Sequence, residues 1–339
     1  MTESKQKMAA APYPDGDTLW HTIRYPDSAA SPAHWQGAFD PVTWRPSANN
    51  SPLSMVSCAG VGDQLQLVAL GGDGQLWHNL LLPGGWDQNS WSIESQEQND
   101  PGRFNWVGCG GVDGELQVVG TDWPKGQLWH TIRHADGTWQ PSFGLIEYNE
   151  SNNPGYFGVV SCAGVGGDLH VVAMSGGQPS QTWHTIRYSA SGSSPAHWQR
   201  TFDSVTWPAG VELAQVSCAD VAGTLQLVGL DAQGQLWRNV YVPGASPSWA
   251  PDPEPIQTII QSNPGHFYSV GCGGANGELH VVGSAVQLWH TIRHADGTWQ
   301  PFFGLIEDNE SNNPGPFSTV GCAGVGGDLH VAACLQLPE

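Results

Sequence analysis

The chain has 339 residues, with 11 basic against 31 acidic side chains and a formal net charge of −20. Nucleic acids and anionic membrane surfaces are bound through basic footprints, so this charge excludes both classes of partner. The 44 Gly, 25 Pro and 17 Trp, with only 12% charged residues, are typical of many short strands joined by tight turns.

No targeting segment is evident. Residues 1–14 lack the apolar core of a secretory signal, and no stretch approaches 18 apolar residues. We therefore expect a soluble protein without membrane insertion, either cytoplasmic or released without a signal peptide. Six of the seven cysteines recur once per repeat in apolar segments, which predicts buried thiols in a reducing compartment rather than disulfides.

A repeat of about 54 residues organises the chain after a predicted tail, residues 1–16. Within the predicted single domain, residues 17–339, the six copies begin near residues 19, 76, 128, 182, 236 and 288. One Trp marks each copy: Trp20, Trp77, Trp129, Trp183, Trp237 and Trp289. A Cys recurs in step: Cys58, Cys109, Cys162, Cys218, Cys272 and Cys322.

The copies also show a higher-order repeat. Residues 128–173 match residues 288–333 at 39 of 46 positions. The first copy shares HTIRY, SPAHWQ and VTW with the fourth, and the second shares VGCGG and GEL with the fifth. This pattern indicates a block of three units that was duplicated.

Each unit contains four strand signals separated by Gly-rich turns. Around the third marker Cys they are residues 159–165, 168–174, 182–188 and 197–202. Residues 168–174 (DLHVVAM) are largely apolar on both alternating faces, so we expect a strand covered on both sides. Six sheets buried on both faces pack around an axis, which predicts an all-β, six-bladed β-propeller with four-stranded blades.

The two ends of the chain predict that the ring closes. The first recognisable segment, residues 19–24, corresponds to the third strand of a unit, and residues 320–335 supply only the first two strands. One blade would therefore combine strands from both ends, which removes exposed sheet edges. The alternative, a linear solenoid, needs polar capping repeats that the sequence does not show.

The LWHTIR strand carries the first candidate site. Alternation places its Trp, Thr and Arg on one face, and a guanidinium beside an indole suits a neutral polyol. The alternative is that the Arg ties adjacent blades together while the Trp fills the core. Copies two and five lack the Thr and Arg, reading WHNLLL and WRNVYV. The candidates are Trp20 and Arg24; Trp129, Thr131 and Arg133; Trp183 and Arg187; and Trp289, Thr291 and Arg293.

A second Trp follows this strand in turn-rich surroundings, where partial exposure is expected. It is predicted either to bind ligand or to pack between blades. These residues are Trp35, Trp139, Trp198, Trp249 and Trp299, with Trp86 or Trp91 in the second copy. Residues 145–155 and 305–315 offer further polar contacts such as Glu147, Asn149 and Asn152, or form a solvated loop.

Catalytic and metal chemistry receive little support from the sequence. The 13 histidines follow the repeat without ligand spacing, so we expect no metal and no cofactor. DGTW resembles part of the Asp-box of sialidases, but the preceding Ser is missing. The candidate polar residues recur in several copies, which favours binding over a single catalytic centre. A glycosidase and a protein-binding scaffold remain alternatives.

The strings LWHTIRHADGTWQP-FG and GDLHVV resemble the PLL lectins, fucose-binding β-propeller lectins of Photorhabdus, over residues 17–334. The resemblance implies a lectin with several pockets between adjacent blades that bind L-fucose and O-methylated sugars, often as a homo-oligomer. Those lectins have seven blades, whereas this chain has six repeats, so their pocket geometry is not carried over.

The resulting hypothesis is a multivalent lectin whose partners are glycans or glycoconjugates. Its pockets are predicted to use the Trp and Arg of HTIR together with the second Trp. Copies three and six, which carry Arg133 and Arg293, rank first, followed by copies one and four, which carry Arg24 and Arg187.

Overall fold

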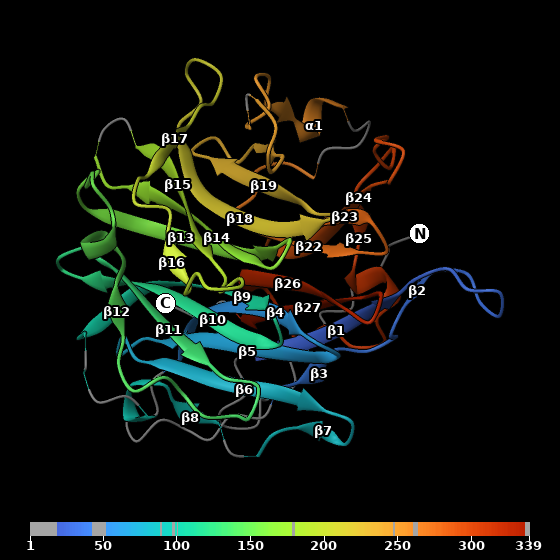
Figure 1. Ribbon diagram of the computed structural model, residues 1–339. Helices are drawn as coiled ribbons and strands as arrows, with labels where there is room; N and C mark the ends of the chain where they lie inside the picture. The colour runs from blue at the N-terminus through green and yellow to red at the C-terminus, as the bar shows by residue number, and fades with distance from the viewer. Residues whose placement is uncertain are drawn as a thin grey trace, which may run out of the picture.

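The computed structural model describes residues 19–42 and 52–335, except for gaps at residues 89, 97–98, 100, 178–179, 247 and 260–263. The predicted tail lies outside the described residues. Six antiparallel sheets, each with a four-stranded path, stand around a common axis (Figure 1). The protein is therefore a six-bladed β-propeller, which confirms the predicted fold class.

Each blade has the same order of strands from the axis outwards. Blades I to VI begin with the innermost strands β4 (Leu53–Val61), β9 (Arg103–Val112), β13 (Phe157–Val165), β18 (Leu213–Val221), β22 (Ser269–Ala275) and β26 (Phe317–Val325). The second strands are β5 (Gln64–Gly71), β10 (Glu115–Trp123), β14 (Asp168–Ser175), β19 (Thr224–Asp231), β23 (Glu278–Ala285) and β27 (Asp328–Leu335).

The outer half of each blade carries the HTIR-type strand and a short edge. The third strands are β6 (Leu76–Leu82), β11 (Leu128–Arg133), β15 (Gln181–Tyr188), β20 (Leu236–Tyr241), β24 (Gln287–Arg293) and β1 (Leu19–Tyr25). The fourth strands are β7 (Gly85–Trp86), β12 (Gly144–Leu145), β16 (His197–Trp198), β21 (Glu254–Pro255), β25 (Gly304–Leu305) and β2 (His34–Trp35).

Short elements complete the described chain. β3 (Asp40–Pro41), β8 (Trp91–Ser92) and β17 (Asp203–Val205) pair with the third strands of blades VI, I and III. The helical turns are η1 (Glu94–Gln96), η2 (Ile146–Asn149), α1 (Ile256–Ile259) and η3 (Glu307–Asn309).

The hydrophobic core lies between the blades. The six clusters of buried apolar side chains found in the described residues each join one blade to the next around the ring. In β14, every residue from Leu169 to Met174 is at most 4% exposed, apolar and His side chains alike. Both faces of the strand are therefore covered, as its sequence predicts, and no blade could bury its faces alone.

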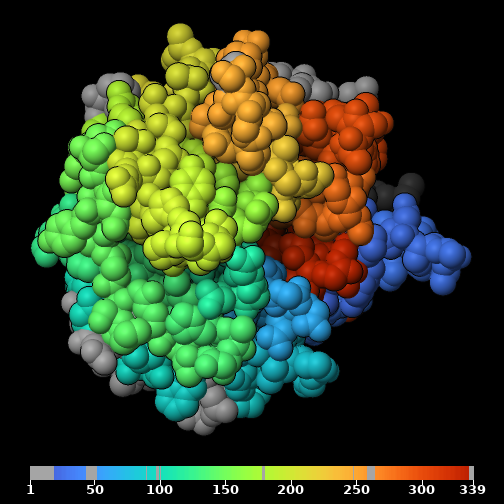
Figure 2. Space-filling view, viewed as in Figure 1, coloured from blue at the N-terminus to red at the C-terminus, as the bar shows by residue number. Residues whose placement is uncertain are grey.

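Blade VI closes the ring with both ends of the chain. β1 pairs antiparallel with β27, with Leu19 opposite Cys334 and Arg24 opposite Leu329. The blue N-terminal residues accordingly lie beside the red C-terminal residues in Figures 1 and 2. The predicted closure is confirmed and the linear solenoid is excluded. Each sequence copy thus spans the outer half of one blade and the inner half of the next.

Candidate functional site

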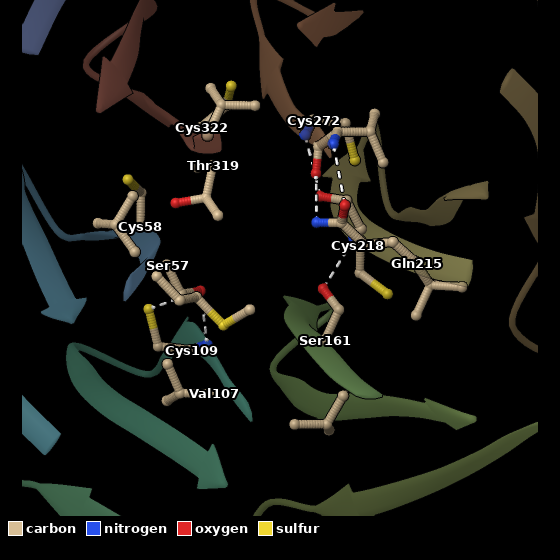
Figure 3. Close-up of a pocket in the computed structure, with 18 of the residues that line it drawn as sticks. Ser57, Cys58, Val107, Cys109, Ser161, Gln215, Cys218, Cys272, Thr319 and Cys322 are labelled. Carbon is tan, nitrogen blue, oxygen red and sulfur yellow. Dashed lines mark hydrogen bonds between the residues drawn. The ribbon is translucent and has the colours of Figure 1, made fainter. Parts of the chain in front are cut away.

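The axial channel is the first hollow to consider. Figure 3 shows the side chains of the innermost strands, among them Cys58, Cys109 and Cys272, around its centre. The cavity at this level is only about 40 Å³, whereas small-molecule sites typically enclose about 300–1,000 Å³. This part of the channel is therefore too narrow for a sugar.

All seven cysteines are free and buried, which confirms that they form no disulfides. The six repeated ones line the channel, and Cys334 lies in β27. Burial raises the pKa of the Cys109 and Cys272 thiols to about 12, so both are protonated at neutral pH. A protonated, buried thiol is a small apolar side chain and a poor nucleophile.

The clefts between blades are the second kind of hollow. The Trp, Thr and Arg of each third strand face the preceding blade: Thr22 donates to Glu310 at 2.6 Å, and Thr185 donates to Glu150 at 2.9 Å. The His of the same strand faces the following blade. Residues from two neighbouring repeats therefore meet in every cleft, as the sequence-based hypothesis requires.

The first Trp of each copy lies away from the Arg of its own strand. The two are four residues apart, or about 13 Å along an extended strand. Trp20, Trp129, Trp183 and Trp289 are half-buried against the clusters between blades. These indoles therefore support the core, and the structure does not bring them together with the guanidinium groups.

The second Trp is the aromatic neighbour of the Arg. Trp35 lies opposite Arg24 and Trp198 opposite Arg187 on adjacent strands, so each pair of side chains shares one face of its blade. Trp139 and Trp299 hold the same relation to Arg133 and Arg293.

Except for Trp299, whose neighbour at that position is Arg238, the second Trp also packs edge-on against a His of the preceding blade. The ring centroids of Trp198 and His130 are 5.4 Å apart at an interplanar angle of 89°, and those of Trp35 and His290 are 5.3 Å apart at 88°. In blade I this position belongs to Trp86, which meets His21, whereas Trp91 is 54% exposed in β8. Trp35, Trp139, Trp249 and Trp299 are partly exposed, as predicted, whereas Trp86 and Trp198 are buried.

A recess of about 370 Å³ lies between blades V and VI. Arg24 enters it from blade VI, and Glu278, His280 and His294 line it from blade V. Burial lowers the pKa of the half-buried Arg24, while the carboxylates of Glu278 and Asp27 oppose this effect. Within the described chain, no side chain forms an ion pair with Arg24 at 4 Å or less. Its guanidinium N–H groups are therefore available to donate hydrogen bonds to a ligand.

A second recess, between blades II and III, measures about 390 Å³ and shares with the first only the equivalent positions of the Arg and one Ala, Arg187 and Ala196. Arg187 and Trp198 line it from blade III, and His130, Gln140 and Asn149 line it from blade II. Burial lowers the pKa of Arg187, and Glu115 of blade II opposes the shift. Among the described residues Arg187, like Arg24, forms no ion pair within 4 Å.

A hydrogen-bonded His–Glu pair lies on the blade V side of the cleft between blades V and VI. Its counterpart lies on the blade II side of the cleft between blades II and III. His294 Nδ1 lies 2.7 Å from Glu278 Oε1, and His134 Nδ1 lies 2.7 Å from Glu115 Oε1. None of these residues was among the predicted site residues, and His134 and His294 directly follow the predicted LWHTIR strands. The GEL string shared by copies two and five, which contains both glutamates, is the sequence signal that identifies them.

Arg133 and Arg293 have different surroundings. A Cβ on Gly137 would lie 3.1 Å from Arg133 Nη2, and one on Gly297 would lie 3.3 Å from Arg293 Nη2. Both guanidinium groups therefore lie against the short turns of their own blades. Arg293 is also 3.9 Å from Glu254, which forms a 3.1 Å ion pair with Arg238.

Residues 145–155 have structural contacts. Glu147 accepts a hydrogen bond from the backbone of Leu128 at 2.9 Å, and Asn149 donates to the carbonyl of Leu145. Asn152 bonds both the amide and the carbonyl of Phe202 in the next blade, at 2.8 and 3.0 Å. The segment thus joins blades II and III, and only Asn149 of these three lines the recess.

Within the described residues, no group of three or more His, Cys, Asp or Glu side chains is placed to hold a metal ion. The described helical segments include none that is long and apolar enough to cross a membrane.

Comparison with known proteins gives similarity at the level of the fold. No protein-family model and no curated protein matches the chain. AofleA from Arthrobotrys oligospora gives a TM-score of 0.54 at 12% identity, covering 96% of this chain and 88% of that one. A variant of AofleA in which three arginines are replaced by alanine gives 0.56.

A fungal fucose-binding lectin of the same architecture is also similar. The lectin of Aleuria aurantia, a six-bladed β-propeller with a novel fucose recognition mode, gives a TM-score of 0.50 at 14% identity, covering 81% of this chain and 86% of that one. Its variants are known in complex with Fucα1-6GlcNAc and α-methyl-L-fucoside. At these identities the similarities support the propeller fold of this chain.

Proposed function

We propose that this protein is a carbohydrate-binding lectin that holds neutral sugars in recesses between adjacent blades. The observation that carries the proposal is the recess at Arg24, about 370 Å³ in volume, where a guanidinium group without a close ion pair lies opposite Glu278. A second recess between blades lies at Arg187.

The chemistry of the recess suits a sugar ring. Guanidinium N–H groups donate to hydroxyl and ring oxygens, and a carboxylate such as Glu278 accepts from hydroxyl groups. The side chains of Ala33, Ile292 and Leu329 line the recess and offer an apolar surface for the C–H face of the ring. The net charge of −20 disfavours anionic glycans, so a neutral glycan is the better partner.

The comparisons support a glycan as the ligand but do not identify the sugar. The Aleuria aurantia lectin is described as recognising fucose, and AofleA was studied with three arginines removed. The resemblance to the PLL lectins points to L-fucose or an O-methylated sugar. We expect each recess to bind weakly, with a Kd near 1 mM, which corresponds to about −4 kcal/mol.

A glycan array that includes fucosylated and O-methylated glycans tests the proposal. We expect binding to neutral glycans, and we expect the double substitution Arg24→Ala with Arg187→Ala to reduce it at least about tenfold, because charge-assisted hydrogen bonds contribute about 1.5–3 kcal/mol. Arg103→Ala is the matched control, because the Arg103 side chain donates to the carbonyl of Asp73.

An array with no bound glycan would overturn the proposal. Equal loss of binding in the Arg103→Ala protein would also count against it, because the loss would then reflect general damage. Turnover of a chromogenic glycoside would support the alternative of a glycosidase.

A further inference from the structure

We propose, building on the lectin function above, that only two of the six clefts bind ligand. These are the recess between blades II and III (II/III) and the recess between blades V and VI (V/VI), which makes a single chain a divalent cross-linker. The inference rests on what fills each cleft and on the lengths of the loops beside it.

The two clefts contain similar chains of contacts, and the V/VI chain borders its recess through Glu278, His280 and His294. In V/VI, Glu278 lies 2.7 Å from His294 and 4.0 Å from His280, whose ring is 3.0 Å from that of His290, and His290 meets Trp35. This chain of side chains leads from the solvent-exposed rim of the recess to its buried wall.

In II/III the chain is repeated with one change. Glu115 lies 2.7 Å from His134 and 3.5 Å from Gln117, which bonds His130 at 2.8 Å, and His130 meets Trp198. A Gln thus replaces the His of the second strand while the order of contacts is kept. The Glu–His pair at the start of the chain is what these two clefts share, because the inner contacts also occur elsewhere, as among Gln66, His78 and Trp139 of the cleft between blades I and II.

Loop length separates these recesses from two other clefts. Ten residues, 25–34 and 188–197, connect the paired Arg and Trp in blades VI and III. In blades II and V only five residues, 134–138 and 294–298, make the same connection. The longer loops supply Ala33 and Ala196 as recess walls.

In the clefts with short loops, the arginines lie beside the turns of their own blades, and of the two only Arg293 has a described carboxylate within 4 Å. Arg133 and Arg293 lie against Gly137 and Gly297 of their own turns. In IV/V, Arg238 replaces the usual His and shares Glu254 with Arg293. Because Glu254 forms a 3.1 Å ion pair with Arg238 and lies 3.9 Å from Arg293, it competes with a neutral sugar for these cations.

The remaining two clefts have lost the arginine. In III/IV, Tyr241 takes its position and packs against His170, His184 and Trp249 with centroid distances of 4.7 to 5.4 Å. In VI/I the position is Leu81, which packs in the cluster that contains Trp86. Each of these side chains fills the space that the guanidinium group borders elsewhere.

The placement of the two recesses has a functional consequence. They are three blades apart in a closed ring of six, on opposite sides of the axis. Two sites on one rigid chain can bridge two glycan-bearing partners, and removing one site abolishes bridging while leaving the other site intact.

Equilibrium dialysis with methyl α-L-fucoside and with 3-O-methylglucose counts the sites. We expect two bound ligands per wild-type chain at saturation, one in Arg24→Ala, one in Arg187→Ala and none in the double variant. Arg133→Ala and Arg293→Ala are expected to keep two. If an Arg variant folds poorly, Glu278→Gln or Glu115→Gln replaces it and is expected to lose the same one bound ligand per chain. Arg103→Ala is the matched control.

Cross-linking of beads coated with the same sugars provides an independent readout. Wild-type protein should aggregate the beads, whereas either single variant should bind them without aggregation. More than two ligands per chain, or residual binding in the folded double variant, would overturn the divalent arrangement and leave the lectin function standing. Absence of binding to these probes and to every glycan of the array would instead remove the lectin function itself.

Discussion

At the inner rim of the ring, the residue two positions after the repeated Cys is glycine in five of six blades. A Cβ on Gly164 would lie 1.9 Å from the carbonyl oxygen of Gly111, and one on Gly274 would lie 1.8 Å from that of Asp220. Such separations are far below van der Waals contact, so these positions require the absence of a side chain. The glycines thus set how closely neighbouring innermost strands approach.

Gly164→Ala should therefore destabilise the protein by about 3 kcal/mol, because the blades must move apart to admit the methyl group. Urea unfolding of the variant and the wild type measures this difference. Gly84→Ala is the control, since a Cβ there meets nothing within 4 Å and its φ is not in the left-handed region. Equal stability of the two variants would show that the ring tolerates wider spacing.

At the scale of elements, the closing blade joins segments from opposite ends of the chain. β1 lies between β27 and the edge strand β2, and Leu19, Phe39 and Val42 contribute to the clusters on the two flanks of blade VI. The Asn312 side chain links blades V and VI through two hydrogen bonds to the backbone of Phe39, at 2.7 and 2.9 Å.

Deletion of residues 1–42 should therefore abolish the single cooperative thermal transition, because it exposes the edge of β27 and opens two hydrophobic clusters. Deletion of residues 1–16, the predicted tail, should leave the melting temperature unchanged. Calorimetry of both deletions provides the comparison. A shortened protein that still melts cooperatively without residues 1–42 would show that closure is dispensable.

At the scale of the whole molecule, buried histidines make stability depend on pH. Burial lowers the pKa of these side chains to about 3 for His21, His78, His130 and His280, and to about 4 for His170 and His330. Their unfolded values are near 6.5, so below this pH the unfolded chain binds more protons and stability falls.

Two buried carboxylates act in the opposite direction. Burial raises the pKa of Glu147 and Glu307 to about 7, so the folded state binds more protons than the unfolded state between about pH 4.5 and 7. Their contribution to stability is lost as pH rises through 7. Because the histidines are more numerous, acid should destabilise the protein on balance.

We expect the free energy of unfolding to fall steeply as the pH decreases from about 6.5 towards 4. Each buried His contributes up to about 1.4 kcal/mol per pH unit in this window. Replacing His78 with Gln should flatten the slope by up to that amount, whereas His197→Gln should not, because His197 is exposed. Urea unfolding at a series of pH values is the measurement, and a flat profile down to pH 4 would contradict the expectation.

The number of blades, the closure of the ring and the burial of the cysteines were predictable from the sequence. Each depends on a pattern that recurs in every copy, such as the marker Trp, the apolar strands and the two half-units at the ends of the chain. A repeat that leaves both faces of its sheet apolar has few ways to bury them, so its periodicity determines the architecture.

The sequence also identified the arginines and the second Trp, but only the tertiary structure decided which of them border a recess. Arg24 faces Glu278 and Arg187 faces Glu115, and each pair belongs to different repeats that only the ring brings together. Arg133 and Arg293 carry the same HTIR motif, but short turns hold them against their own blades. A local pattern determines which face of a strand a side chain occupies, whereas the space in front of it depends on the neighbouring blade and on the loop that passes between them.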